Sequence, residues 1–284
     1  MGRSADLESV PPTHPAAHCL DRLHGLDGDD RVALARLFGA TQWVGPGEVV
    51  APEGGAAGGL CALLDGWACR CKDFHDGRRQ IIALLIPGDL LLQDHVPRAG
   101  AADHAVITLT EATIAWIPQE AMATVLRDHP GIARALRTAA AVELSALRAW
   151  LVNLGLRSAQ QRMAHLFCEL AARLEPIPIG LNQPDRDKRA PTRTPERFPV
   201  ARPVSTFAEG VAALADRRSP TAFDLPLTQQ ALGWALGLTT VHVNRVLQQL
   251  RRDGLIDFRG GVLAIPDPAR LEALAGFDRA YLAA

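Results

Sequence analysis

Residues 227–250 have the sequence LTQQALGWALGLTTVHVNRVLQQL, and this stretch decides the fold of the C-terminal part of the chain. We expect Thr228 to cap a first helix and Thr239 to cap a second, with a tight turn at Gly237 between them. Apolar residues recur with helical spacing in both segments, at Ala231, Leu232, Ala235 and Leu236 and then at Val243, Val246, Leu247 and Leu250. Two short helices joined by such a turn predict a helix-turn-helix.

The second helix leaves a polar face that suits contact with base edges in the major groove. Arg245 can donate two hydrogen bonds to guanine, and Asn244 or Gln248 can pair with adenine. Val241 can contact a thymine methyl group, and Thr240 or His242 can bond a base or a phosphate. This face therefore predicts binding to double-stranded DNA.

The residues after the second helix indicate a wing. Residues 255–258 and 262–265 are apolar runs that flank Gly260 and Gly261, a pattern typical of a β-hairpin. The segment as a whole therefore predicts a winged helix-turn-helix. The alternative is an αα-hairpin within a helical bundle, which the wing and the two capping threonines disfavour.

Composition limits the remaining function classes. The 284 residues are 48% hydrophobic, enough for about two ordinary domains. The formal net charge of −1 requires any DNA affinity to come from a local patch. No unbroken apolar run approaches the ~20 residues that span a bilayer, and residues 1–15 lack a signal-peptide core. We therefore expect a cytoplasmic protein with no membrane partner.

The cysteines are odd in number and poorly spaced for a disulfide framework or a zinc site. No metal and no cofactor is predicted. Two of them alternate along an expected strand beside Trp67, where small buried side chains are the favoured interpretation and a redox role is the lesser alternative. The five cysteines are Cys19, Cys61, Cys69, Cys71 and Cys168, and the alternating pair is Cys69 and Cys71.

Short strands are expected from residue 43 to about residue 118, because glycine-containing turns interrupt apolar runs about every ten residues. This spacing is typical of a barrel or sandwich. Asp76 and Gly77 lie between the runs 67–74 and 80–86 and predict a hairpin. Residues 106–110 and 113–117 supply later strands.

Helical periodicity follows. From residue 132 to residue 154 the chain has no proline or glycine, and apolar residues recur every three or four positions, the spacing of a coiled coil. This segment predicts a dimer helix, and packing against its own barrel is a compatible alternative. The recurring residues are Ala140, Leu144, Leu147, Leu151 and Leu154.

A further amphipathic helix is expected at residues 157–174, with its apolar face on Met163, Leu166, Phe167 and Leu170. Proline and charge then dominate residues 176–220, which we interpret as a loop or linker, with added phosphate contacts as the alternative. Thr206 and Glu209 resemble a capping box and predict a short helix over residues 206–216.

Taken together, a β-roll, a long helix and a winged helix-turn-helix resemble the Crp/Fnr superfamily of bacterial transcription regulators. The resemblance implies an α+β fold with a cyclic-nucleotide-binding-like β-roll in residues 1–130 and a dimerisation helix in residues 131–156. The DNA-binding domain would cover residues 157–276, with residues 176–220 as an insertion. The motifs that carry the resemblance are PGE at 46–48, LLDG at 63–66, DGRRQ at 76–80, LIPGDL at 85–90, RSAQQR at 157–162, LTQQ at 227–230 and GLTTVHVNR at 237–245.

The resemblance implies a homodimer, formed through residues 140–154, on a palindromic operator. RNA polymerase would be a further partner. Gln229 and Gln230 would contact phosphate, while the second helix would face the bases. The DNA-binding residues expected on this basis are Thr228, Gln229, Gln230, Thr239, Thr240, Val241, His242, Asn244 and Arg245.

The departures from the family pattern concern the effector. Cyclic-nucleotide-binding members carry a Gly-Glu pair after the Pro-Gly-Asp turn and an Arg-Ser pair later. Here these pairs fall on residues 92–93 and about 103–104, where an aspartate replaces the cation that a cyclic phosphate needs. We therefore expect no response to cyclic AMP. A divergent pocket would be lined by Leu92, Gln93, Asp103, His104, Leu147 and Arg148.

Two other family variants are disfavoured. An iron–sulfur cluster would need several N-terminal cysteines, and only Cys19 is present there. A haem ligand could only be His75, which belongs to a turn where a solvated histidine is the better interpretation. Val241 stands where many members have a glutamate, so the operator should differ from the best-known one.

Two other function classes remain open. The first is a ligand- or partner-binding roll whose helix-turn-helix has lost DNA binding. The second is a cupin-like enzyme, which would need a His-x-His metal cluster that the nine histidines do not offer. We predict that the chain is not an enzyme.

Overall fold

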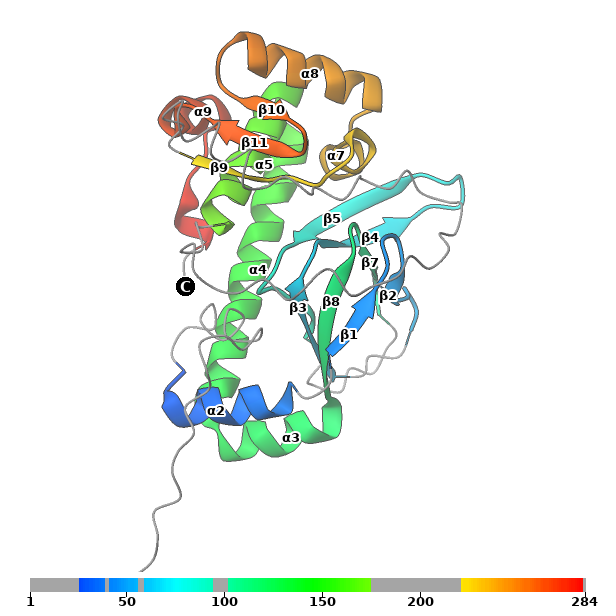
Figure 1. The fold of residues 1–284 in the computed structure, drawn as a ribbon, viewed down its shortest axis with the longest axis vertical. Coiled ribbons are helices and arrows are strands. Elements are labelled where there is room, and N and C mark those ends of the chain that lie inside the picture. The colour runs from blue at the N-terminus through cyan, green and yellow to red at the C-terminus, as the bar shows by residue number, and fades with distance from the viewer. Residues whose placement is uncertain (1–25, 39–40, 56–58, 94–101, 175–220, 283–284) are drawn as a thin grey trace, which may run out of the picture.

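The computed structural model describes residues 26–38, 41–55, 59–93, 102–174 and 221–282. It has the expected α+β fold, in which a β-roll, a long helix and a winged helix-turn-helix follow one another along the chain (Figure 1). Cys19, the expected linker at 176–220 and the short helix expected at 206–216 lie outside the described residues.

The roll consists of two antiparallel four-stranded sheets. One has the strand order β1-β8-β3-β6, and the other has the order β2-β7-β4-β5. The expected Asp76-Gly77 hairpin is confirmed, because Asp73 at the end of one strand pairs with Arg79 at the start of the next. The strands are β1 (Thr41–Val44), β2 (Val49–Ala51), β3 (Gly59–Asp65), β4 (Ala68–Asp73), β5 (Arg79–Leu85), β6 (Leu90–Gln93), β7 (Ala105–Thr108) and β8 (Ala112–Pro118).

Strand β3 of the first sheet is buried on both faces. Alternate residues of β3 point to opposite sides, so that Cys61 and Leu63 fill the interior of the roll while Leu60 and Ala62 face a layer of helices. That layer contains α2 (Gly28–Leu37), α3 (Gln119–Asp128) and the first turns of α4 (Pro130–Leu156), which lie together below the roll in Figure 1.

Helix α4 is the longest element, and its burial changes along its length. Ile132 and Leu136 pack under the first sheet, and Trp150 packs against the following helix. A stripe of exposed leucines, Leu144, Leu147 and Leu151, begins between them and ends directly after Trp150. By length and composition alone α4 could also cross a membrane, although it contains no unbroken apolar run long enough to span a bilayer. Its alanines and few charges raise the hydropathy without forming such a run.

Helix α5 (Ala159–Arg173) begins where the sequence indicates. Ser158 caps it, because the Ser158 hydroxyl accepts from the Gln161 N–H at 3.3 Å and the Gln161 side chain accepts from the Ser158 N–H at 3.0 Å. The expected inner face is confirmed, since Met163, Leu166, Phe167 and Leu170 are all buried.

The C-terminal unit has the order of a winged helix-turn-helix. Its small sheet has the order β10-β11-β9, and β9 was not expected from the sequence. The first wing strand starts at Asp257 rather than at residue 255, because Leu255 and Ile256 are buried in the core instead of pairing along the sheet. The elements are β9 (Thr221–Asp224), α7 (Gln229–Leu236), α8 (Thr240–Arg252), β10 (Asp257–Arg259), β11 (Val262–Ile265), α9 (Pro268–Ala275) and the short helix η2 (Arg279–Leu282).

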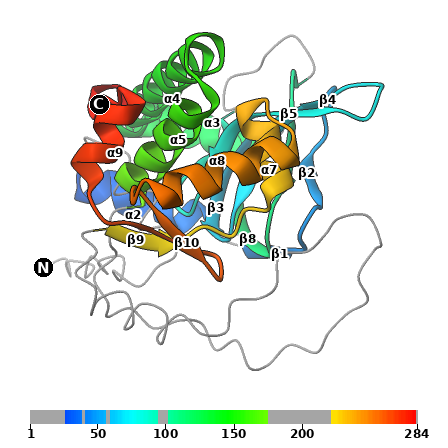
Figure 2. The same cartoon turned by 90° about the horizontal axis from the view of Figure 1, so that it is seen from above.

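The roll and the C-terminal unit share one hydrophobic core. Trp67, Cys69 and Cys71 on the outer face of the second sheet join the same cluster as Leu232 of α7 and Leu247 of α8. The favoured interpretation of the alternating cysteines is therefore confirmed, since both are free, buried and packed among apolar side chains. Seen from above, α7 and α8 lie over the roll (Figure 2).

Candidate DNA-binding surface

The two helices of the helix-turn-helix begin at the expected threonines. The Thr228 hydroxyl accepts from the Ala231 N–H at 3.0 Å, and the Thr239 hydroxyl accepts from the His242 N–H at 3.3 Å. Gly237 ends α7 with φ 63°, the left-handed conformation that glycine adopts most easily. Both helix starts and the turn are therefore confirmed.

Two residues that the sequence analysis did not single out hold the turn in place. A Cβ atom at Gly233 would lie 2.5 Å from the Leu238 carbonyl oxygen, so only glycine allows the turn to fold back onto α7. Arg162 of α5 donates to the Leu236 carbonyl at 2.8 Å, which satisfies the C-terminal end of α7. A glycine four positions before the turn glycine was the available signal for the first contact.

Helix α8 separates into a buried face and an exposed face. Its four expected apolar positions are all buried. The exposed face belongs to a helix at one end of the molecule, opposite α2 and α3 (Figure 1). It carries Thr240, Val241, His242, Asn244, Arg245 and Gln248.

The chemistry of this face suits an external partner. Val241 is 70% exposed, although burial is the usual preference of a valine. Within the described part of the chain, the Arg245 side chain forms no hydrogen bond or ion pair, so its donors are available to a ligand. Gln248 donates to the Asn244 side chain at 3.3 Å, which orders two amides that can each pair with a base.

Backbone donors and cations surround this face. The exposed Gln229 and Gln230 form the first turn of α7, and the exposed Thr239 caps α8, so both helix N-termini offer N–H groups suited to phosphate. The wing turns at Gly260 and Gly261, whose φ values are 58° and 83°. Exposed arginines flank the helix and the wing, at Arg251, Arg252 and Arg259.

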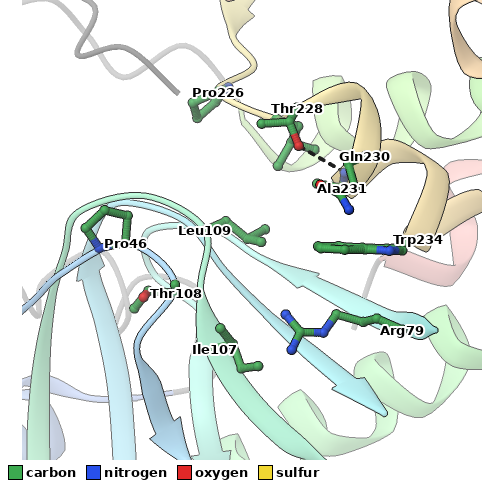
Figure 3. A pocket seen from close by; sticks show the side chains of 12 residues that line it. Pro46, Arg79, Ile107, Thr108, Leu109, Pro226, Thr228, Gln230, Ala231 and Trp234 are labelled. Atoms are coloured by element: carbon green, nitrogen blue, oxygen red, sulfur yellow. Dashed lines mark hydrogen bonds between the residues drawn. The ribbon is translucent and has the colours of Figure 1, made fainter. Parts of the chain in front are cut away.

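A small cavity lies beneath α7, between the helix-turn-helix and the roll. The Trp234 ring covers the Arg79 guanidinium, whose carbon lies 5.2 Å from the ring centre (Figure 3). Arg79 also donates to both oxygens of Asp73, at 2.6 and 2.7 Å. Thr228 and Gln230, which are expected to contact DNA, also border this cavity. The N-terminal end of α7 therefore lies beside the roll.

A buried hydrogen-bond network joins α5 to three other parts of the molecule. Glu169 accepts from the Trp150 indole at 2.7 Å and from the Tyr281 hydroxyl at 3.0 Å. Arg173 donates to Glu169 at 3.1 Å and also binds Asp89 in the Pro-Gly-Asp turn of the roll. Burial and the Glu169 charge raise the pKa of Tyr281, so the phenol remains a donor.

The residues expected to line an effector pocket are not among those that line the cavity beneath α7. Leu92 and Gln93 pair with β3 along strand β6, and Asp103 binds the His104 imidazole at 2.7 Å. Leu147 and Arg148 are exposed on α4. His75 is exposed in its turn, as expected for a solvated histidine.

Two family models match the chain. Residues 41–129 match the cyclic nucleotide-binding domain, and residues 208–274 match the Crp-like helix-turn-helix domain. The chain belongs to the Crp/Fnr superfamily. It is a DNA-binding transcription regulator of the Crp/Fnr type, and this membership implies a regulator rather than an enzyme. In the described residues, no group of three or more His, Cys, Asp or Glu side chains is placed to hold a metal ion.

Named Crp/Fnr proteins match over most of their length. The transcriptional activator protein FnrL of Cereibacter sphaeroides is 25% identical over 233 residues, which are 82% of this chain and 79% of that protein. The nitrogen fixation regulation protein FixK of Bradyrhizobium diazoefficiens is 27% identical over 229 residues, or 81% of this chain and 79% of that protein.

Solved Crp/Fnr structures share the fold. FixK2 from Bradyrhizobium japonicum superposes with a TM-score of 0.61 at 20% identity, covering 83% of this chain and 96% of that one. The c-di-GMP-responsive regulator CLP from Xanthomonas campestris superposes with a TM-score of 0.56 at 16% identity, covering 84% of this chain and 99% of that one. At these identities the likeness concerns the fold alone.

Proposed function

We propose that this regulator is a homodimer that binds a palindromic operator through one copy of α8 in each half-site, without control by cyclic AMP. Residues 1–130 act as the sensor roll, residues 131–156 as the dimer helix and residues 157–276 as the DNA-binding domain. The observation that carries the proposal is the exposed polar face of α8, where Arg245 forms no hydrogen bond or ion pair with any other described residue.

Self-association is supported by the exposed leucine stripe of α4. Its residues recur every three or four positions, which is the pattern of a coiled coil rather than of a lipid-facing surface apolar on all sides. Other positions of α4 have polar contacts, because Glu143 pairs with Arg70 and Trp150 binds Glu169. A second copy of α4 therefore fits the stripe better than a membrane does.

Independence from cyclic AMP is supported by the charge at residue 103. The resemblance places the phosphate-binding arginine at about this position, and the chain has Asp103 bound to His104. A carboxylate repels a cyclic phosphate, and only a cation or a cluster of donors would compensate.

The set of bases contacted follows from the exposed face of α8. Arg245 is the residue that selects guanine, and Asn244 selects adenine. Val241 replaces a hydrogen-bonding side chain with a methyl-binding one, so the operator differs from one selected by a glutamate at this position. RNA polymerase is the further partner of such a regulator, and the cytoplasm is its location.

Replacing Arg245 tests this assignment. Arg245→Ala removes two donors to one base pair, so we expect specific binding to weaken by about 1–3 kcal/mol and preference at that position to relax. Fluorescence anisotropy with a palindromic duplex, and with single-base variants of it, measures both effects.

The control variant is Arg127→Ala, which removes another exposed arginine, from α3 at the other end of the molecule. Its affinity should equal that of the wild type. If Arg245→Ala bound the duplex as tightly and as selectively as the wild type, α8 would not be the base-contacting helix. Weak binding that is insensitive to salt would favour a helix-turn-helix that has lost its DNA function, because phosphate contacts release counterions.

A further inference from the structure

Arg70 is a buried cation inside the roll. Along β4, Cys69 and Cys71 face the core shared with the DNA-binding domain, whereas Ala68 lies in the interior cluster of the roll. Arg70 lies between the two cysteines, is only 5% exposed, and extends to the opposite sheet. A guanidinium is rarely buried unless its charge is paired and its donors are satisfied.

Three segments meet at this guanidinium. Arg70 Nη2 donates to the Leu90 carbonyl at 2.8 Å, and Nε donates to the Leu91 carbonyl at 3.3 Å, both on β6. Nη1 forms an ion pair with the Glu143 carboxylate of α4. Arg70 thereby connects the strand on which an effector pocket was expected to the helix that would form the dimer.

The position of Glu143 on α4 explains how this ion pair can influence dimerisation. Between the turns of α4 that pack under the roll, ending at Leu136, and the buried Trp150, the helix is exposed or only partly buried. Glu143 is in this middle section and directly precedes Leu144, the first residue of the exposed leucine stripe. The ion pair therefore fixes α4 against rotation about its axis and against sliding along that axis, in the section where a second copy of α4 would pack.

We propose that the Arg70–Glu143 ion pair is a built-in bridge from the roll to the dimer helix, which holds the regulator in its DNA-binding form without an anionic effector. Without this ion pair, a small anion bound between the roll and α4 would have to connect the two. Here Glu143 already neutralises the buried cation, so an anionic ligand must displace it. This inference rests on the proposed dimeric, DNA-binding function.

The test uses the purified full chain without added ligand. Glu143→Met leaves the buried Arg70 without its partner, and Arg70→Met leaves the partly exposed Glu143 without its partner, whereas the double variant replaces the pair by two apolar side chains. Each of the three variants should bind a palindromic duplex about tenfold more weakly than the wild type, within the 5–150-fold typical of coupling between sites. The double variant should be no weaker than either single variant, because one bridge is lost in all three.

Lys72→Met is the matched control, because Lys72 lies on the same strand but forms its ion pair with Glu53 at the surface. It should bind like the wild type. If Arg70→Met does not fold, Glu143→Gln carries the test, since Glu143 is partly exposed and the change preserves its shape.

Sedimentation equilibrium provides a readout that does not depend on DNA. The bridge variants should dimerise about tenfold more weakly than the wild type, so this measurement tests the bridge even if no duplex is bound and the proposed function fails. The proposal is overturned if folded Arg70→Met or Glu143→Gln matches the wild type in both affinities. It is also overturned if the wild type binds its duplex only after cyclic AMP or inorganic phosphate is added.

Discussion

At the scale of single residues, His165 is a neutral histidine inside the DNA-binding half of the molecule. Its side chain is 2% exposed and stacks on Tyr281 at 5.9 Å, with the edge of Phe277 at 5.3 Å. Burial, and then the charge of Arg157, lower the pKa of His165 to about 4. The imidazole therefore remains uncharged in the folded protein at neutral pH.

This histidine predicts a loss of stability in mild acid. Its pKa is about 4 when folded and about 6.5 when unfolded. Below about 6.5 the unfolded chain binds a proton that the folded chain does not, so stability falls as the pH drops toward 4. Between about pH 7.5 and about pH 5 the loss from this group should be about 2 kcal/mol. Urea unfolding of the wild type and His165→Phe at both pH values measures it.

The comparison needs a second histidine as its control. His242 is exposed on α8, so His242→Phe should retain the full acid sensitivity of the wild type. His165→Phe should lose about 2 kcal/mol less than the wild type on acidification. Equal losses in the wild type and His165→Phe would show that His165 is not the group responsible.

Residues whose role depends on neighbours along the chain could be predicted from the sequence. Thr228 and Thr239 cap helices because a hydroxyl reaches an N–H group three positions later, and that spacing is visible in the sequence. Arg70 could not be identified in this way, because its partners lie on β6 and α4. On an alternating strand it resembles any solvent-facing arginine. The arrangement of the DNA-binding residues on the exposed face of α8 follows from helical periodicity, whereas their contacts with DNA remain predictions.

At the scale of elements, α4 combines two functions in one helix. Its first turns complete the core under the first sheet, and its middle section presents the leucine stripe. Leu151 is the most exposed residue of the stripe, at 73%. An isolated helix surface of this kind is stabilised when a second copy covers it.

A charge at Leu151 should separate the proposed dimer without unfolding the subunit. In Leu151→Glu the carboxylate would be buried unpaired at the interface, so dimerisation should weaken by about 2 kcal/mol or more. The subunit should unfold at the same urea concentration, because the side chain is exposed in the single chain. Arg134→Glu, at an exposed position of α4 outside residues 140–154, is the control and should dimerise normally. A Leu151→Glu protein that remained as strongly dimeric as the wild type would place the interface elsewhere.

Elements with strong local signals were predicted better than those that depend on tertiary contacts. The hairpin at Asp76 and Gly77 and the helix expected to open at residues 157–158 have such signals, and both are confirmed. Strand β9 has none, since Thr221–Asp224 is short and is stabilised only by pairing with β11. The helices α2 and α3 also went unrecognised, because their apolar residues have no long periodic run and are buried only against the roll.

At the scale of the whole molecule, the roll and the DNA-binding domain are packed together rather than held on a free linker. The shared core, the stacking of Trp234 on Arg79 and the link from Arg173 to Asp89 connect the two units at three places. A change in the roll can therefore reach α7 and α8 through packed side chains. The sequence could establish the order of the units, but not this packing, because the contacts join residues more than 80 positions apart.

The most direct test of the account is the DNA sequence that the purified wild-type protein selects from a random duplex library without any added ligand. The account predicts an enriched motif with two-fold symmetry, a guanine contact in each half, and half-sites about one helical turn apart. It also predicts that a duplex with both half-sites binds the dimer. Selection of a single asymmetric site, or of no motif at all, would contradict the claim that two copies of α8 bind a palindromic operator.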